Sequence, residues 1–188
     1  MTVEEYFDLE ENDSEMRYEY VDGYVYAMAG GSIDHGTIGG NIFATLRNLL
    51  RGTPCRVFNS DLRVRISETR YFHPDVTVSC DPRNQTGKNQ FVEAPRVVFE
   101  VLSPPTEARD RGRKMRQYLA CPTVEEYLLV NQNAPRIEIY RKGNATWYYS
   151  AFEAGDEVEL RSLGVHFPIE EVYVDVVLPE VSEEEEDD

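Results

Sequence analysis

The chain of 188 residues has the length of one ordinary domain, and its hydrophobic fraction of 41% and aromatic fraction of 11% exclude general disorder. Its formal net charge of -16 opposes non-specific attraction to a nucleic-acid backbone. Seven acidic residues and no basic residue lie between residues 180 and 188, so we expect a single domain over residues 1–178 and an acidic, flexible tail over residues 179–188.

The cysteines and the amino-terminal segment predict a cytoplasmic protein. Cys55, Cys80 and Cys121 are widely spaced and include no CxxC pair, so we expect neither a disulfide framework nor a zinc site. This usage fits a reducing cytoplasm. The amino terminus is acidic, and no apolar stretch is long enough to cross a bilayer, so we expect neither secretion nor membrane insertion.

The first part of the chain predicts two helices with a hairpin between them. Thr2 followed by Glu5 matches a capping box, which predicts a short helix. The dipeptide Asp22-Gly23 suits a two-residue hairpin turn that requires positive φ. Apolar residues at helical spacing then predict a longer helix that packs on a sheet. The expected ranges are 3–9 for the first helix, 17–21 and 24–28 for the hairpin strands, and 33–50 for the second helix.

The remainder of the chain predicts short strands and one charged helix. Residues 96–102 form a nearly continuous apolar run, typical of a strand covered on both faces, and we expect this to be the central strand. Thr106 can cap the charged helix. The other expected elements are strands at 56–59, 61–67, 75–80, 125–130, 136–141, 145–152 and 157–162, and helices at 107–120 and 169–173. This order predicts an α/β protein with an α+β mixed sheet flanked by helices.

Glu100 is the most informative residue of the expected central strand. Residues two apart share one face of a strand, so Glu100 lies beside Val98 and Leu102, where an unpaired carboxylate is costly. A metal ion, a protonated state or a buried basic partner would each compensate it. Asp75 begins another short apolar strand, and if the two strands are neighbours, both carboxylates can hold a hard cation such as Mg²⁺.

The expected helix at 107–120 carries the only dense basic stretch of the sequence. Lys114 lies four residues after Asp110, a spacing that also fits an ordinary surface ion pair. Arg113 and Arg116 belong to the same stretch, which is either a phosphate-binding face or a solvated one.

Several short motifs occur together in the order and spacing of one known family. They are Tyr18-Glu19-Tyr20-Val21-Asp22-Gly23, His35, Pro74-Asp75-Val76, Phe99-Glu100-Val101-Leu102-Ser103-Pro104, Asp110, Lys114, Tyr118 and Glu126-Tyr127. Over residues 2–173 the chain resembles the Uma family, whose members are restriction-endonuclease-like proteins of the PD-(D/E)XK superfamily. The resemblance implies a restriction-endonuclease-like fold.

The resemblance also implies roles for particular residues. Asp75 and Glu100 would bind Mg²⁺, or Mn²⁺, and Lys114 would polarise the scissile phosphate or the attacking water. Glu19 and His35 would line the same cleft, with His35 as a base, a phosphate contact or a hydrogen-bonder at the helix start. The superfamily's lysine normally stands two residues after the acidic strand residue, and Leu102 occupies that position here, so its role would move to Lys114.

The implied activity is metal-dependent hydrolysis of phosphodiester bonds in nucleic acid, with DNA favoured. From the basic stretch of the helix, we expect Arg113 and Arg116 to contact the substrate. We expect a homodimer, because restriction-type nucleases commonly pair subunits to cut both strands. Two alternatives remain: a non-catalytic binding or regulatory module that keeps the fold, and an acidic homo-oligomeric interaction protein whose aromatic strands associate.

Overall fold

The structure, a computed structural model, describes residues 1–13, 16–28, 30–85, 87 and 89–179. The expected acidic tail lies outside the described residues except for Pro179. Its flexibility and the domain boundary at residue 178 therefore stay predictions.

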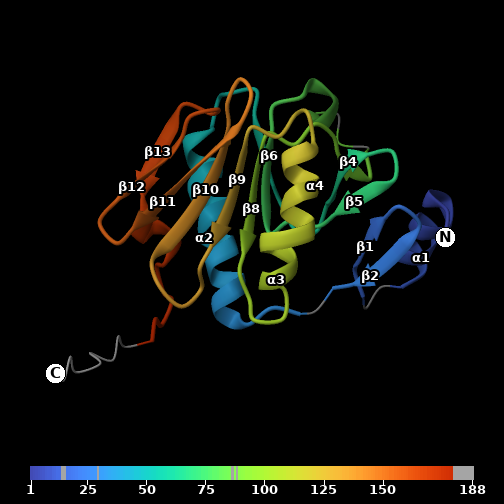
Figure 1. The fold of residues 1–188 in the computed structure, drawn as a ribbon, viewed down its shortest axis with the longest axis horizontal. Coiled ribbons are helices and arrows are strands. Elements are labelled where there is room, and N and C mark those ends of the chain that lie inside the picture. Colours follow the sequence, from blue (N-terminus) through green and yellow to red (C-terminus); the bar gives the residue numbers. More distant parts are fainter. Residues whose placement is uncertain (14–15, 29, 86, 88, 180–188) are drawn as a thin grey trace.

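A six-stranded sheet in the order β11-β10-β9-β8-β6-β3 forms the centre of the fold (Figure 1). β8 lies between β6 and β9, so the apolar run expected as a central strand is indeed an interior one. β8 and β9 are parallel, and the other pairs are antiparallel. The strands are β3 (Arg56–Asn59), β6 (Val76–Ser79), β8 (Val97–Val101), β9 (Glu126–Val130), β10 (Arg136–Lys142) and β11 (Trp147–Glu153).

A second sheet in the order β2-β1-β5-β4-β7 and a separate hairpin of β12 and β13 complete the strands. The sequence predicted one mixed sheet and did not predict β5, β7 and β13. These short strands are specified by pairing with distant segments rather than by local pattern. The strands are β1 (Tyr18–Val21), β2 (Tyr24–Ala27), β4 (Arg63–Ser67), β5 (Arg70–Phe72), β7 (Phe91–Val92), β12 (Glu157–Leu160) and β13 (Val165–Pro168).

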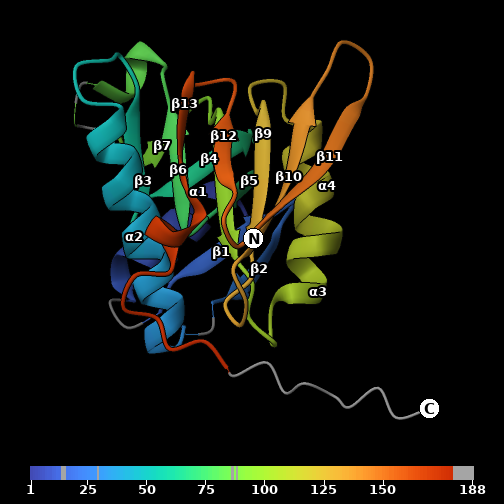
Figure 2. The ribbon, with the colours of Figure 1, turned by 90° about the vertical axis from the view of Figure 1, so that its left-hand side faces the viewer.

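Helices cover both faces of the six-stranded sheet, and Figure 2 shows them on opposite sides of it. α2 (Ile33–Leu49) covers one face. The opposite face carries α3 (Glu107–Arg109), the π-helical segment η2 (Asp110–Lys114) and α4 (Met115–Ala120). The predicted helix over residues 107–120 is therefore present, but a π-helical segment that the sequence did not predict divides it.

The other helical segments lie near the ends of the chain and beyond β6. They are α1 (Val3–Asn12) and the 3₁₀ turns Pro82–Gln85 and Ile169–Val172. Within the described ranges, no helix is both long and apolar enough to cross a membrane.

The side chains of β8 alternate between two hydrophobic cores. Val97 and Phe99 join the core beneath α2, whereas Val98 and Leu102 join the core that contains Tyr118 of α4. Because residues two apart share a face, Glu100 points to the side of η2 and α4. The face predicted for Glu100 from the sequence is thus confirmed.

A disulfide bond joins Cys55 to Cys80, so the expectation of no disulfide framework was wrong. The two cysteines flank the paired strands β3 and β6, whose register places Arg56 opposite Ser79. They meet because the strands pair, which their spacing in the sequence does not reveal. Cys121 is free and buried.

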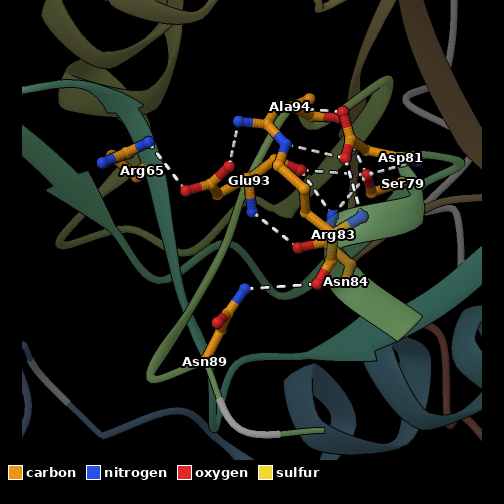
Figure 3. Close-up of polar contacts among 8 residues, drawn as sticks. All are labelled: Arg65, Ser79, Asp81, Arg83, Asn84, Asn89, Glu93 and Ala94. Atoms are coloured by element: carbon orange, nitrogen blue, oxygen red, sulfur yellow. Dashed lines mark hydrogen bonds and ion pairs between the residues drawn. The ribbon is translucent and has the colours of Figure 1, made fainter. Parts of the chain in front are cut away.

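A polar network fixes the segment between β6 and β7 (Figure 3). Arg83 forms ion pairs with Asp81 and Glu93, and Arg65 Nη2 lies 2.8 Å from Glu93 Oε1. The Asn84 side chain donates to the Glu93 carbonyl at 2.6 Å. These arginines are therefore neutralised by nearby carboxylates of the fold.

Candidate active site

A cleft of about 530 Å³ opens beside the carboxyl end of β8 and the first half of α2. Three glycines of α2 line it, and a Cβ at any of them would meet no atom within 4 Å. α2 therefore presents open backbone to the cleft at Gly36, Gly39 and Gly40.

Asp75 and Glu100 lie on paired strands. β6 and β8 are antiparallel with Val76 opposite Phe99, so Asp75, one residue before Val76, faces Glu100, one residue after Phe99. The condition that their strands be neighbours is confirmed, and both residues line the cleft.

Lys114, at the end of η2, binds the acidic groups from the opposite side. Its Nζ lies 2.8 Å from Glu100 Oε1, 2.9 Å from Glu19 Oε1 and 3.9 Å from Asp110 Oδ1. The Lys114 side chain is only 3% exposed. The surface ion pair considered as an alternative for Lys114 is therefore not what the structure contains.

The charge state of Lys114 follows from this enclosure. Burial acts to lower the pKa of Lys114, but the carboxylates of Glu100, Glu19 and Asp110 outweigh burial and raise it. Burial likewise acts to raise the pKa of Glu19, but Lys114 and Arg109 outweigh it, and the pKa is lowered. Lys114 is therefore a cation and Glu19 an anion at neutral pH.

Glu100 behaves differently although it contacts the same amine. Burial raises the pKa of Glu100 well above its usual range, and the nearby Asp110, Asp75 and Glu19 add to the effect against the opposing charge of Lys114. The electrostatic environment thus disfavours a bare Glu100 carboxylate. A proton or a further cation would compensate it.

Asp75 is held by two groups at the end of β8 and the start of α2. Its Oδ2 accepts a hydrogen bond from the Val101 amide at 2.7 Å and lies 3.5 Å from His35 Nε2. His35 Nε2 is also 3.1 Å from the Val101 carbonyl, and the His35 amide donates to the Ser32 hydroxyl that caps α2. Burial raises the pKa of Asp75, with His35 and the Val101 amide opposing it.

The donor set fits a hard divalent cation. Four acidic side chains gather around the site: Lys114 lies within 4 Å of Glu19, Glu100 and Asp110, Arg109 contacts Glu19, and Asp75 is close to Glu100. Mg²⁺ is commonly held by one or two carboxylates and retains water. In the part of the chain that the structure describes, no group of three or more His, Cys, Asp or Glu side chains is arranged to bind a metal. Asp75 and Glu100, which both line the cleft, are the candidate ligands.

Not every predicted site residue lies in the cleft. Glu19 contacts Lys114 but is absent from the cleft lining, so it supports the lysine from behind. Arg113 donates to the Tyr26 hydroxyl at 2.8 Å, and Arg116 is exposed outside the cleft. The residues that do line it are Asp75, Glu100, Lys114 and His35.

Three residues of the site were not among those predicted to act there. Arg109 lines the cleft and lies 3.2 Å from Glu19 Oε2. His73 also lines the cleft, and its amide contacts Glu19 Oε1 at 3.4 Å. Asp110 Oδ1 is buried and, among the described residues, has no hydrogen-bond partner. His73 stands directly before Pro74-Asp75, which was the available signal for it.

The fold and the cleft together define a restriction-endonuclease-like protein. A crystal structure described as a putative nuclease belonging to DUF820, from Anabaena variabilis, matches with a TM-score of 0.76. The match covers 94% of this chain and 99% of that chain at 19% sequence identity, and so concerns the fold.

The chain belongs to the Uma2 family, described as "Putative restriction endonuclease", whose sequence profile matches residues 3–170. Two uncharacterized proteins of Synechocystis sp. are also similar. Protein slr1290 is 41% identical over 175 residues, 92% of this chain and 91% of the relative. Protein sll1609 is 33% identical over 150 residues, 78% of this chain and 84% of the relative. The family and the fold class predicted from the sequence are both confirmed.

Proposed function

We propose that this protein is a Mg²⁺- or Mn²⁺-dependent endonuclease that hydrolyses phosphodiester bonds of nucleic acid, with DNA favoured. The observation that carries the proposal is the meeting of Asp75 and Glu100 across β6 and β8, with Lys114 Nζ 2.8 Å from Glu100. Membership of a family described as "Putative restriction endonuclease" supports the same reaction class.

In this proposal Asp75 and Glu100 hold the cation. When bound, the metal lowers the pKa of a coordinated water and neutralises charge that develops on the phosphate. The chain supplies fixed charge and orientation around it. The amide of Val101 and the ring of His35 keep Asp75 in place, so His35 acts as a positioning residue.

Lys114 contributes an electrostatic effect rather than proton transfer. Its pKa is raised, so it keeps its proton at neutral pH and cannot serve as a base. Glu19 and Glu100 fix its amine, which places a pre-oriented positive charge where the scissile phosphate would gather negative charge.

The buried Glu100–Lys114 pair also favours a second candidate function. Lys114 contacts Glu100 directly, and a buried ion pair of this kind also occurs as a purely structural contact, as in a non-catalytic module that keeps the nuclease fold. The homodimer, the cytoplasmic location and the substrate contacts of Arg113 and Arg116 stay predictions in either case.

A cleavage assay distinguishes the two candidates. Wild type is incubated with single- and double-stranded DNA and RNA in Mg²⁺ or Mn²⁺, beside Asp75→Asn and the control Asp8→Asn, which removes the same charge from an exposed position of α1. We expect wild type and Asp8→Asn to cut DNA and Asp75→Asn to lose at least about 100-fold in rate, as for loss of a metal ligand or its support. A wild type that cuts none of the four substrates would favour the non-catalytic module.

A further inference from the structure

A second polar hollow, of about 320 Å³, lies where α2 ends and β3 begins. Arg47 reaches it from the last turn of α2, and Arg51 reaches it from the loop that follows the helix. Arg56 reaches it from the first residue of β3. No acidic residue is part of its lining, so the hollow is locally cationic in a chain of net charge -16.

These three arginines differ from most others in the described part of the chain. Arg65 and Arg83, for example, are paired with carboxylates, as Figure 3 shows. Arg47, Arg51 and Arg56 are exposed, and none of them forms an ion pair within the described residues. The Arg51 guanidinium donates to the Asn48 side chain at 3.0 Å, which leaves its charge uncompensated.

The backbone that carries the hollow is fixed. The Thr53 amide and hydroxyl both donate to the Leu50 carbonyl, at 3.1 and 2.8 Å, and the Thr53 hydroxyl accepts from the Cys55 amide. The Cys55–Cys80 disulfide then ties this loop to the end of β6. A pre-formed site loses less conformational entropy on binding than a flexible one.

We propose that this hollow binds backbone phosphates of the same nucleic acid on which the cleft acts, an inference that rests on the proposed function. Guanidinium groups match phosphate geometry, and uncompensated cations are what phosphate binding needs. The two sites lie at opposite ends of α2, whose start and end are visible in Figure 2. From His35 to Leu49 the helix rises about 21 Å, which corresponds to about six base pairs of duplex, and Arg51 lies beyond its end.

The test measures how duplex binding depends on salt and on duplex length. One variant combines Arg47→Gln, Arg51→Gln and Arg56→Gln. The control removes three arginines that already have acidic partners, with the same change of net charge: Arg96→Gln, Arg136→Gln and Arg161→Gln. Fluorescence anisotropy is recorded in Ca²⁺ with duplexes of about 30 and about six base pairs, because only the longer one can reach both sites.

For the long duplex, the variant in the hollow should lose at least about tenfold in affinity at low salt. The slope of log K against log salt should fall by about two to three, whereas the control keeps the wild-type slope. The short duplex, which can occupy only one site at a time, should show a smaller difference between wild type and variant than the long one does. These results together support a phosphate-binding surface at the end of α2, beyond the half of the helix that lines the cleft.

Other results overturn the inference in recognisable ways. If wild type binds and cuts the long duplex and the variant matches it in affinity and slope, this inference fails while the proposed function stands. If wild type binds no nucleic acid, both fail.

If calorimetry shows inorganic phosphate binding that needs the three arginines while duplex binding does not, the hollow is a small-anion site. If the arginines affect duplex binding only after the acids of residues 180–188 are replaced by amides, the occupant is the chain's own tail.

Discussion

The amine of Lys114 lies between two buried carboxylates, those of Glu19 and Glu100, and is almost inaccessible to water. Removing one partner from a buried charge cluster leaves the other charges uncompensated, which typically costs about 3–5 kcal/mol. Lys114→Met should therefore lower the free energy of unfolding by about that amount, measured by urea denaturation at neutral pH.

The matched control is the double change Lys114→Met with Glu100→Gln. Because it also removes a buried carboxylate, it should recover part of the stability lost in the single variant. A single variant that unfolds within about 1 kcal/mol of wild type would contradict the buried ion-pair cluster.

A second prediction concerns Glu138 on β10, which accepts hydrogen bonds from Arg111 at 2.7 and 2.8 Å. These bonds lower the pKa of Glu138 below its ordinary value of 4.5, although burial opposes them. A carboxyl group with a lowered pKa in the fold stabilises it above its unfolded-state pKa and loses that contribution as the pH falls through the folded value. Glu138→Gln should cost about 1 kcal/mol at neutral pH and flatten the loss of stability below about pH 4.5.

The measurement is the free energy of unfolding of both proteins from neutral to acid pH. The two curves should converge as the pH falls. Curves that stay parallel across this range would show that the Arg111–Glu138 pair does not contribute in the stated way.

For single residues, the sequence predicted the direction in which a side chain points better than it predicted the side chain's partners. Alternation along the apolar run placed Glu100 on one face of its strand, because a strand has a fixed period of two. The contact of Lys114 with Glu19 joins residues 95 positions apart in the chain, and no local pattern encodes it. The family resemblance, rather than periodicity, predicted that Lys114 and Glu19 lie at the same site.

At the scale of elements, the disulfide fastens β3 to β6, the strand that follows Asp75. The cysteines are 25 residues apart, and closing a loop of that size typically stabilises a fold by about 3.5 kcal/mol. Reducing wild type, or replacing Cys55 and Cys80 by Ala, should lower the unfolding free energy by about that amount. Urea unfolding with and without reductant checks this, because the double variant should not respond to reductant. A wild type that does not respond either would contradict the disulfide.

Elements with strong local signals were predicted well, and the others were not. The capping box of α1 forms as expected, with reciprocal bonds between Thr2 and Glu5. The Asp22-Gly23 turn also forms, with both residues at positive φ. The π-helical turn η2 was not predictable, because its residues are compatible with an ordinary helix and the fold selects the wider turn around Asp110 and Lys114.

For the whole molecule, the net charge of -16 opposes the proposed nucleic-acid substrate, and the acidic tail contributes seven of those charges. Replacing the tail acids by their amides should strengthen duplex binding at low salt, and the gain should vanish at high salt because screening removes the repulsion. Anisotropy titrations at two salt concentrations measure this. An affinity that is unchanged at low salt would mean that the tail does not oppose binding.

The most direct measurement of the central claim is calorimetric titration of Mn²⁺ into wild type and into the double variant Asp75→Asn, Glu100→Gln at several pH values. The account predicts that wild type binds the ion and that affinity rises with pH, because both carboxyl groups have raised pKa values and must lose their protons to coordinate it. The double variant should bind at least about tenfold more weakly. Equal binding by the two proteins, or none by wild type, would contradict a metal site at Asp75 and Glu100.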